Sequence, residues 1–184
     1  MAGSISRSIA FGGHPVSAGR RVVFPLALLV ILAALSTGHN QVLINTTPSE
    51  PEGIYWRVAA PVAVGQLVAF KAPAAAFPYA DRRLGFIHRV PLLKAVAAGP
   101  GDTVCTADQR LVINGAYRAS ILVFDERGRA LPQWSGCRPM AANEWFLFSN
   151  RVPRSFDSRY FGPVGREAIL GVYAPLVTTA NGGR

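Results

Sequence analysis

The chain has 184 residues and a formal net charge of +9, with 50% hydrophobic and only 16% charged residues. This composition excludes a long disordered tail or a coiled coil, and the length suits one ordinary domain with a short accessory segment. The arginines are scattered rather than gathered on one element, which argues against nucleic-acid binding. A basic surface facing an anionic membrane explains the charge better.

An apolar segment at residues 22–38 follows two consecutive arginines, and no acidic residue precedes Glu50. Its length of about 17 residues is at the short end of what spans a bilayer. Positive charge on its N-terminal side predicts a cytoplasmic segment at residues 1–21. We therefore expect a single-pass protein of the bacterial inner membrane, with residues 39–184 in the periplasm. A cleaved signal peptide and a buried helix of a soluble core are the alternatives.

Cys105 and Cys137 are the two cysteines of the chain, and both lie in the part expected to be exported. In an oxidising compartment an even pair most simply forms a disulfide, which would close a loop of about 30 residues and stabilise the fold by roughly 3–4 kcal/mol. Two unrelated buried thiols are the alternative. No metal-ligand spacing surrounds them, so we expect neither a metal nor another cofactor.

Beyond residue 38, short apolar runs alternate with turn signals, at residues 65–70, 90–98, 110–115, 121–124, 144–148 and 168–177. The segment Gly99–Asp102 is a strong turn signal, and Asn114-Gly115 is a dipeptide preferred in two-residue hairpins. The Ala- and Pro-rich residues 72–83 are expected to form a loop. Since no window beyond the membrane segment keeps a helical period, the pattern predicts one all-β sandwich or barrel.

Catalysis by histidine or by metal finds little support in the sequence. A Ser-His-Asp triad needs an imidazole within reach of a serine, and among three histidines only His88 lies away from the cytoplasmic and membrane segments. The chain has no His-Glu-x-x-His motif and no Gly-rich phosphate loop followed by lysine. Serine paired with lysine is the chemistry that remains.

Lys71 and Lys94 are the only lysines in a chain that otherwise uses arginine. Lys94 stands inside an apolar run, whereas Lys71 follows a strand end in a position typical of solvent. A lysine acts as a general base only when it is neutral, and burial lowers its pKa from about 10.4 by as much as 3–5 units. Arginine cannot replace it, because guanidinium does not deprotonate in proteins. Lys94 is therefore the candidate base; a lysine reaching solvent from a strand face is the alternative.

The candidate nucleophile is Ser49, within the segment Asn45–Tyr55. The neighbouring Pro48 and Pro51, with Gly53, restrict the backbone and would hold the serine hydroxyl in a fixed, exposed position. A plain polar loop leaving the membrane is the alternative on these residues alone.

Three segments in chain order, Ser49–Gly53, Leu93–Asp102 and Ser155–Pro163, resemble the successive boxes of type I signal peptidases, in the form found in conjugative transfer (TraF-like). The resemblance runs from the membrane segment to about Tyr173. It implies an all-β signal-peptidase fold, a complex barrel or sandwich, behind a single N-terminal transmembrane helix.

The resemblance also implies roles for particular residues. Ser49 would be the nucleophile and Lys94 its general base. Ser155 would donate a hydrogen bond that orients the lysine, and Asp157 and Arg159 would form a structural ion pair that supports the site.

Thr47 matches a hydroxyl position that helps the Ser49 backbone N–H to form the oxyanion hole. Two departures stand beside this match. Glu50 follows the nucleophile where the general signal peptidases have an apolar methionine that contributes to membrane contact. Pro48 precedes it where they often have glycine.

The resemblance implies a membrane-anchored serine endopeptidase that cleaves leader segments from exported precursors, with small residues before the scissile bond. The expected partners are the membrane and a protein substrate, most naturally a pilin or another conjugation protein. A non-catalytic envelope or secretion-channel assembly protein that retains the fold is the alternative, and Glu50 is the residue that favours it. A self-cleaving repressor with the same chemistry would need a DNA-binding helical domain.

Overall fold

The computed structural model describes three stretches of the chain, residues 41–77, 79–80 and 90–179. They fall within one compact unit that spans Asn40–Arg184. The predicted cytoplasmic segment and membrane anchor, residues 1–38, and also His88, lie outside the described residues. Within the described stretches, no helix is both long enough and apolar enough to cross a bilayer.

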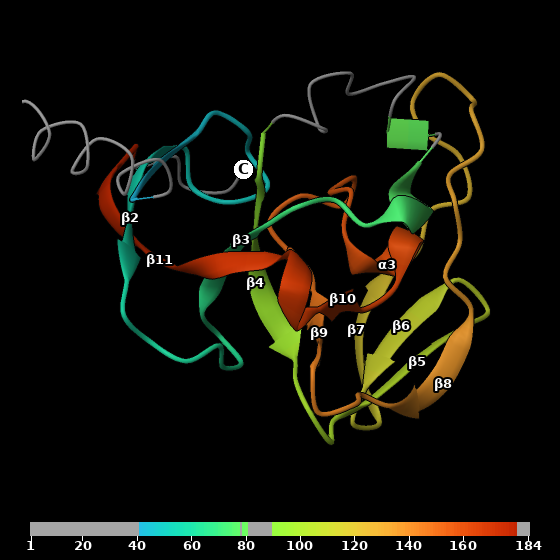
Figure 1. The fold of residues 1–184 in the computed structure, drawn as a ribbon. Helices are drawn as coiled ribbons and strands as arrows, with labels where there is room; N and C mark the ends of the chain where they lie inside the picture. The colour runs from blue at the N-terminus through green and yellow to red at the C-terminus, as the bar shows by residue number, and fades with distance from the viewer. Residues whose placement is uncertain (1–40, 78, 81–89, 180–184) are drawn as a thin grey trace, which may run out of the picture. The chain divides into compact units, whose positions relative to one another are not determined.

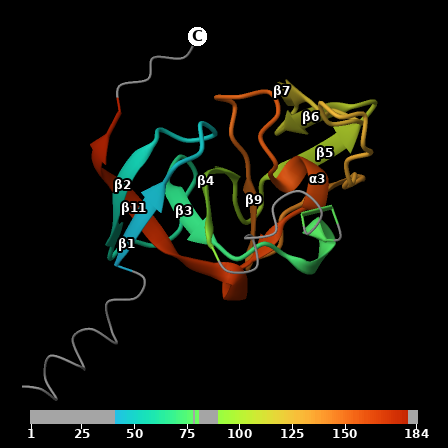
Figure 2. The ribbon, with the colours of Figure 1, turned by 90° about the horizontal axis from the view of Figure 1, so that it is seen from above.

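The described residues form two sheets whose neighbouring strands all run antiparallel (Figure 1, Figure 2). The larger sheet contains, in spatial order, β1 (Val42–Asn45), β2 (Gly53–Val58), β11 (Ile169–Thr178), β3 (Leu67–Phe70), β4 (Leu92–Ala98), β9 (Glu144–Leu147) and β10 (Val164–Gly165). The smaller sheet contains β7 (Ala116–Ser120), β6 (Arg110–Ile113), β5 (Thr103–Ala107) and β8 (Gly136–Pro139). Helical structure in these stretches includes the single turns η2 (Ala74–Ala76), α3 (Ser158–Phe161) and η3 (Arg166–Ala168), and Tyr79 and Ala80 are also helical. The all-β prediction is confirmed.

Most of the predicted strands are present, but the one predicted at residues 121–124 is wrong. The chain leaves β7 at Ser120, and the run then contributes only an isolated bridge between Phe124 and Ala130. Its apolar side chains have other uses: Ile121 is buried in the core and Leu122 lines a cavity described below. The run is apolar because its side chains pack against the core and the cavity, and not because it pairs as a strand.

Two hairpins shape the smaller sheet. Asn114 and Gly115 join β6 to β7 with φ angles of 51° and 78°, as the Asn-Gly signal predicts. Asp108 and Gln109 join β5 to β6 with φ angles of 50° and 58°. Both residues of this second turn also have positive φ, but neither is glycine. The Asn-Gly or Asp-Gly dipeptide that usually indicates such a turn is therefore missing.

Strand β11 holds the larger sheet together, because it pairs with β2 on one side and β3 on the other (Figure 1). Its contact with β2 is unusually close at Gly53. A Cβ built at that glycine would lie 2.1 Å from the carbonyl oxygen of Val177. Only glycine fits there, so the end of the candidate nucleophile segment is fixed against β11.

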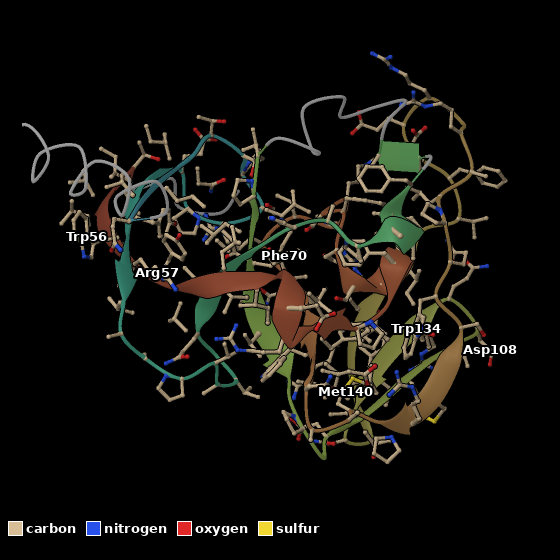
Figure 3. The ribbon with its side chains drawn as sticks, in the orientation of Figure 1. Trp56, Arg57, Phe70, Asp108, Trp134 and Met140 are labelled. Carbon is tan, nitrogen blue, oxygen red and sulfur yellow. A yellow bond between two sulfur atoms is a disulfide. The ribbon has the colours of Figure 1, made fainter. Side chains whose placement is uncertain are left out.

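The core consists of buried clusters that meet along the β4–β9 pair. Val96 and Leu147 belong to the cluster around Phe70, which lies near the middle of the larger sheet (Figure 3). Ala98 and Phe146, one step along the same two strands, belong to the cluster beneath the smaller sheet. Strand β4 therefore packs into both clusters, and this packing fixes the position of the backbone that carries Lys94.

Cys105 on β5 lies directly opposite Cys137 on β8, and the two form a disulfide. The pairing predicted from the cysteine count is confirmed. The crosslink lies within the smaller sheet.

Candidate active site

Several segments that are distant in sequence line one cavity of about 480 Å³. They include the turn after β1, the first half of β4, the loop between β7 and β8, and the segment that leads into α3. Most of the lining is apolar, which suits a site that excludes water from its polar groups. The lining residues are Thr47, Pro48, Ser49, Tyr79, Leu92, Lys94, Leu122, Asp125, Glu126, Leu131, Val152, Pro153, Arg154, Ser155, Phe156 and Tyr160.

Ser49 and Lys94 meet at this cavity. Lys94 Nζ donates a hydrogen bond to Ser49 Oγ over 2.5 Å, although 45 residues separate them in the chain. Both residues are buried, with exposed fractions of 4% for Lys94 and 6% for Ser49. This is the geometry that a nucleophile and its base require.

Burial lowers the pKa of Lys94 from its usual value of 10.5. The carboxylates of Asp157 and Glu50 act against this lowering, and the Arg159 guanidinium adds to it. The balance favours the neutral amine, which is the form that can accept a proton from a serine hydroxyl.

The turn that carries Ser49 is organised by Asn45, a buried residue that the motif analysis did not select. Its side-chain amide donates to the carbonyl oxygens of Thr47, Glu50 and Pro51 at 2.9, 3.0 and 3.1 Å. The Tyr55 hydroxyl also donates to the Pro51 carbonyl. An Asn at the start of a proline-containing turn is a known local signal, and it could have been recognised.

Thr47 lies beside the nucleophile, with its Oγ1 3.4 Å from Ser49 Oγ. Its hydroxyl donates to Asn45 Oδ1 at 2.8 Å. The predicted oxyanion role would therefore require this hydroxyl to rotate away from Asn45.

Asp157 and Arg159 form an ion pair that is almost fully buried, with Nε and Oδ1 2.8 Å apart. Arg159 also donates to the backbone carbonyls of Ser120, Pro153 and Ser155. Because each charge has a full set of partners, the pair can remain ionised in the interior. It fixes the segment before α3 as one wall of the cavity.

Ser155 lies on this wall, but its predicted hydrogen bond to Lys94 is absent. In the described part of the chain, the buried Ser155 Oγ has no hydrogen-bond partner. Lys94 Nζ is directed at Ser49 Oγ instead, while Arg159 holds the Ser155 carbonyl at 2.8 Å. The residue is thus positioned by its backbone and not by its hydroxyl.

Ser149 is a second residue that the motif analysis did not select. It is buried, and its hydroxyl donates to the carbonyl oxygen of Ser49, 100 positions earlier in the sequence. Its backbone N–H points to Asp157 Oδ2 at 3.4 Å. Ser149 therefore links the nucleophile turn to the buried ion pair. A lone serine after an apolar strand has no local signal that would predict this.

Glu50 is buried as well, with an exposed fraction of 5%. Its side chain is therefore not available for membrane contact, which is the role expected of the methionine at this position in general signal peptidases. Its carboxylate accepts the Ala95 backbone N–H on β4 at 3.2 Å.

Among the described residues, no group of three or more His, Cys, Asp or Glu side chains could hold a metal ion.

Comparison with known proteins places the chain in a family. The family described as "Signal peptidase, peptidase S26" matches residues 16–177. A plasmid transfer protein TraF from Escherichia coli is 35% identical over 162 residues, covering 83% of this chain and 90% of the relative.

A conjugal transfer protein TraF from Agrobacterium fabrum is 36% identical over 148 residues, covering 73% of this chain and 81% of the relative. A crystal structure of a signal peptidase I from Enterococcus faecalis is 21% identical, with a TM-score of 0.38, and covers 62% of this chain and 98% of that one. That structural likeness is too weak to carry an argument. On the sequence matches, the chain belongs to the signal peptidase family, peptidase S26.

Proposed function

We propose that the protein is a membrane-anchored serine endopeptidase in which Ser49 is the nucleophile and Lys94 the general base. The observation that carries the proposal is the 2.5 Å contact between Lys94 Nζ and Ser49 Oγ at a largely apolar cavity. The lowered pKa of this buried amine supports the same assignment, because a lysine must lose its proton to act as a general base.

The reaction follows from this geometry. Neutral Lys94 accepts the Ser49 proton as the hydroxyl oxygen attacks the carbonyl carbon of the scissile peptide bond. The resulting ammonium returns a proton to the leaving amine, which departs and leaves an acyl-enzyme on Ser49. Water then attacks the ester, again with Lys94 as base, and releases the second product.

The tetrahedral intermediate carries a negative oxygen that needs hydrogen-bond donors. The Ser49 backbone N–H is the expected donor, and one such donor contributes roughly 3–4 kcal/mol. The Thr47 hydroxyl, 3.4 Å from Ser49 Oγ, becomes a second donor once it turns from Asn45.

The proposed substrate is an exported precursor, most naturally a pilin, because the relatives are named for plasmid and conjugal transfer. Small residues are expected before the cleaved bond, as in the family.

An exposed apolar face supports the proposed periplasmic, membrane-apposed location of the domain. On β1, Val42 and Ile44 lie directly opposite Trp56 and Ile54 of β2, and all four are exposed. Ile44 is 68% exposed, and Trp56 lies on β2, next to the edge strand β1 (Figure 3). Because β1 directly follows the predicted anchor, this face would lie close to the lipid surface.

The test uses the full chain, reconstituted in membrane vesicles with a precursor that has an apolar leader and small residues before the cleavage site. Ser49→Ala should abolish processing. Thr46→Ala, a matched control at an exposed hydroxyl in the same turn, should retain it. Processing that survives in Ser49→Ala would overturn the assignment.

A second readout separates the enzyme from the non-catalytic assembly protein. In a donor cell that lacks its own copy of the protein, Ser49→Ala should fail to restore plasmid transfer, while Thr46→Ala should restore it. Transfer restored by Ser49→Ala would favour a scaffold that only retains the fold.

A further inference from the structure

Glu50 is the unexplained residue of this site. It follows the nucleophile directly, yet it is a carboxylate with only 5% of its surface exposed. Burying a carboxylate is costly unless polar groups compensate it. Glu50 has one such group in the Ala95 backbone N–H, which donates to its carboxylate at 3.2 Å. Burial still raises the pKa of the Glu50 carboxyl above its usual value, while the positive charges of Lys94 and Arg151 act against this rise. A buried carboxyl directly after a nucleophile calls for a functional explanation.

The hydrogen bond to Ala95 replaces part of a β-ladder. Strand β9 pairs with β4 only at Val96 and Ala98, and the last ladder-like bond runs from the Phe148 N–H to the Ala95 carbonyl at 3.0 Å. In a continued antiparallel ladder one partner residue would take both the N–H and the C=O of Ala95. Here the Glu50 carboxylate accepts the Ala95 N–H in place of a carbonyl oxygen of β9. Ala95 directly follows Lys94, so this replacement lies beside the proposed base.

This contact ties the two halves of the proposed dyad together. Ser49 and Glu50 are consecutive, as are Lys94 and Ala95, so the Glu50–Ala95 bond fixes the two backbones beside the Ser49–Lys94 contact. Ser149 adds a third link, because its hydroxyl donates to the Ser49 carbonyl.

The charge of Glu50 also acts on Lys94. The charged groups that face Lys94 are Asp157, Glu50 and Arg159. Asp157 is committed to Arg159 in a buried ion pair, which offsets its negative charge. Glu50 itself faces Lys94 and Arg151. Of the two carboxylates near the amine, Asp157 is bonded directly to a guanidinium, whereas no guanidinium among the described residues bonds to Glu50.

We propose that Glu50 is a positioning residue: its carboxylate ties the Ser49 turn to β4, and its negative charge sets the acidic limit of activity. The proposal rests on the proposed Ser49–Lys94 dyad. The negative charge favours the ammonium form of Lys94, so the dyad becomes active only at higher pH than it would without Glu50.

The first test measures kcat/KM against pH for Glu50→Gln in the full chain, with the precursor used above. Glutamine keeps the acceptor for Ala95 but loses the charge, so the acidic limb should move to lower pH. The ratio of kcat/KM on that limb to its plateau should rise by about threefold or more. Glu52→Gln, two residues further along the same segment, is the matched control and should leave the limb in place.

Glu50→Leu removes the acceptor as well as the charge. Its plateau kcat should fall below that of Glu50→Gln by about tenfold, because a small misplacement of reacting groups is costly. Equal plateaus for the two variants would overturn the positioning role. An unmoved acidic limb in Glu50→Gln, or an equal shift in Glu52→Gln, would overturn the role of the charge.

A second measurement does not depend on activity. The chain has only two lysines, so protein labelled with ¹³C at lysine Cε gives two lysine signals, and the exposed Lys71 serves as the reference. In Glu50→Gln the Lys94 signal should titrate at lower pH than in the unsubstituted protein. An unchanged titration would sink the inference about Glu50 alone, whereas cleavage by Lys94→Ala would sink the dyad itself.

Discussion

Lys71 lies just after strand β3 and Lys94 lies on the neighbouring strand β4, yet their surroundings differ completely. Lys71 follows the end of β3, where its backbone N–H still bonds to Ala168 at 2.9 Å but its side chain is exposed. Lys94 lies inside β4, opposite Val68, and its amine is buried against Ser49. The comparison teaches that the burial of a lysine amine, and with it the proposed role as a base, depends on the position of the lysine in the sheet and not on the residue type alone.

The largest expected effect separates the two lysines by activity. Lys94→Ala should lower kcat/KM by about 10²–10⁴-fold, because general base catalysis contributes that much. Lys71→Ala should change it less than about twofold, as expected of an exposed side chain away from the cavity. The measurement is precursor cleavage by the full chain in vesicles.

Lys94→Arg sharpens this result, since arginine keeps the positive charge but cannot become neutral. It should be as inactive as Lys94→Ala. An active Lys94→Arg would break the comparison, because a charge alone would then suffice.

A somewhat smaller effect is expected on stability, when a buried ion pair is compared with a partly exposed one. Asp157→Asn leaves Arg159 buried without its counter-charge and should lower the free energy of unfolding by about 3–5 kcal/mol. Glu144→Gln breaks a pair with Arg138 that lies partly in solvent, and should cost about 1 kcal/mol or less. Urea unfolding of the two variants measures both values. Equal losses would show that burial does not distinguish these pairs.

The smallest expected effect is a gain in stability. Because the pKa of Lys94 is lowered in the folded protein, the unfolded chain binds more protons between that pKa and the usual 10.5. The free energy of unfolding therefore rises with pH across this window, and below it the protein carries the full cost of a buried ammonium. Lys94→Met removes that cost and should stabilise the protein at neutral pH by about 1 kcal/mol.

This gain should shrink as the pH approaches 10.5, the usual pKa of lysine. Lys71→Met, the control, should show no such pH-dependent gain. Unfolding at neutral and alkaline pH checks both variants, and a destabilised Lys94→Met would mean that the amine contributes more by its contacts than it costs by its burial.

Some of the fold and site could be predicted because the physical signal is local. Asn114-Gly115 dictates a two-residue hairpin, and an isolated lysine in an apolar run indicates a buried amine. The hairpin at Asp108 and Gln109 is harder to predict, because Asp adopts positive φ only occasionally and Gln109 stands where such turns usually have glycine.

The remaining parts of the site depend on distant contacts. Ser149 acts on Ser49 across 100 positions, and no local pattern reveals such a pairing. Glu50 stands in a polar, proline-containing segment, and nothing in that segment predicts that the fold places it against β4. The predicted Ser155–Lys94 hydrogen bond also failed for this reason, since the direction of a side chain within a cavity is decided by its three-dimensional neighbours.

The disulfide in the smaller sheet has a practical consequence for studies of this protein. It uses both sulfhydryls of the chain, so no free thiol remains. A cysteine introduced at the cavity rim, for example at Arg154 or Glu126, would be the single attachment point for a fluorophore. Such a label could follow the arrival of a precursor in real time without background from other sites.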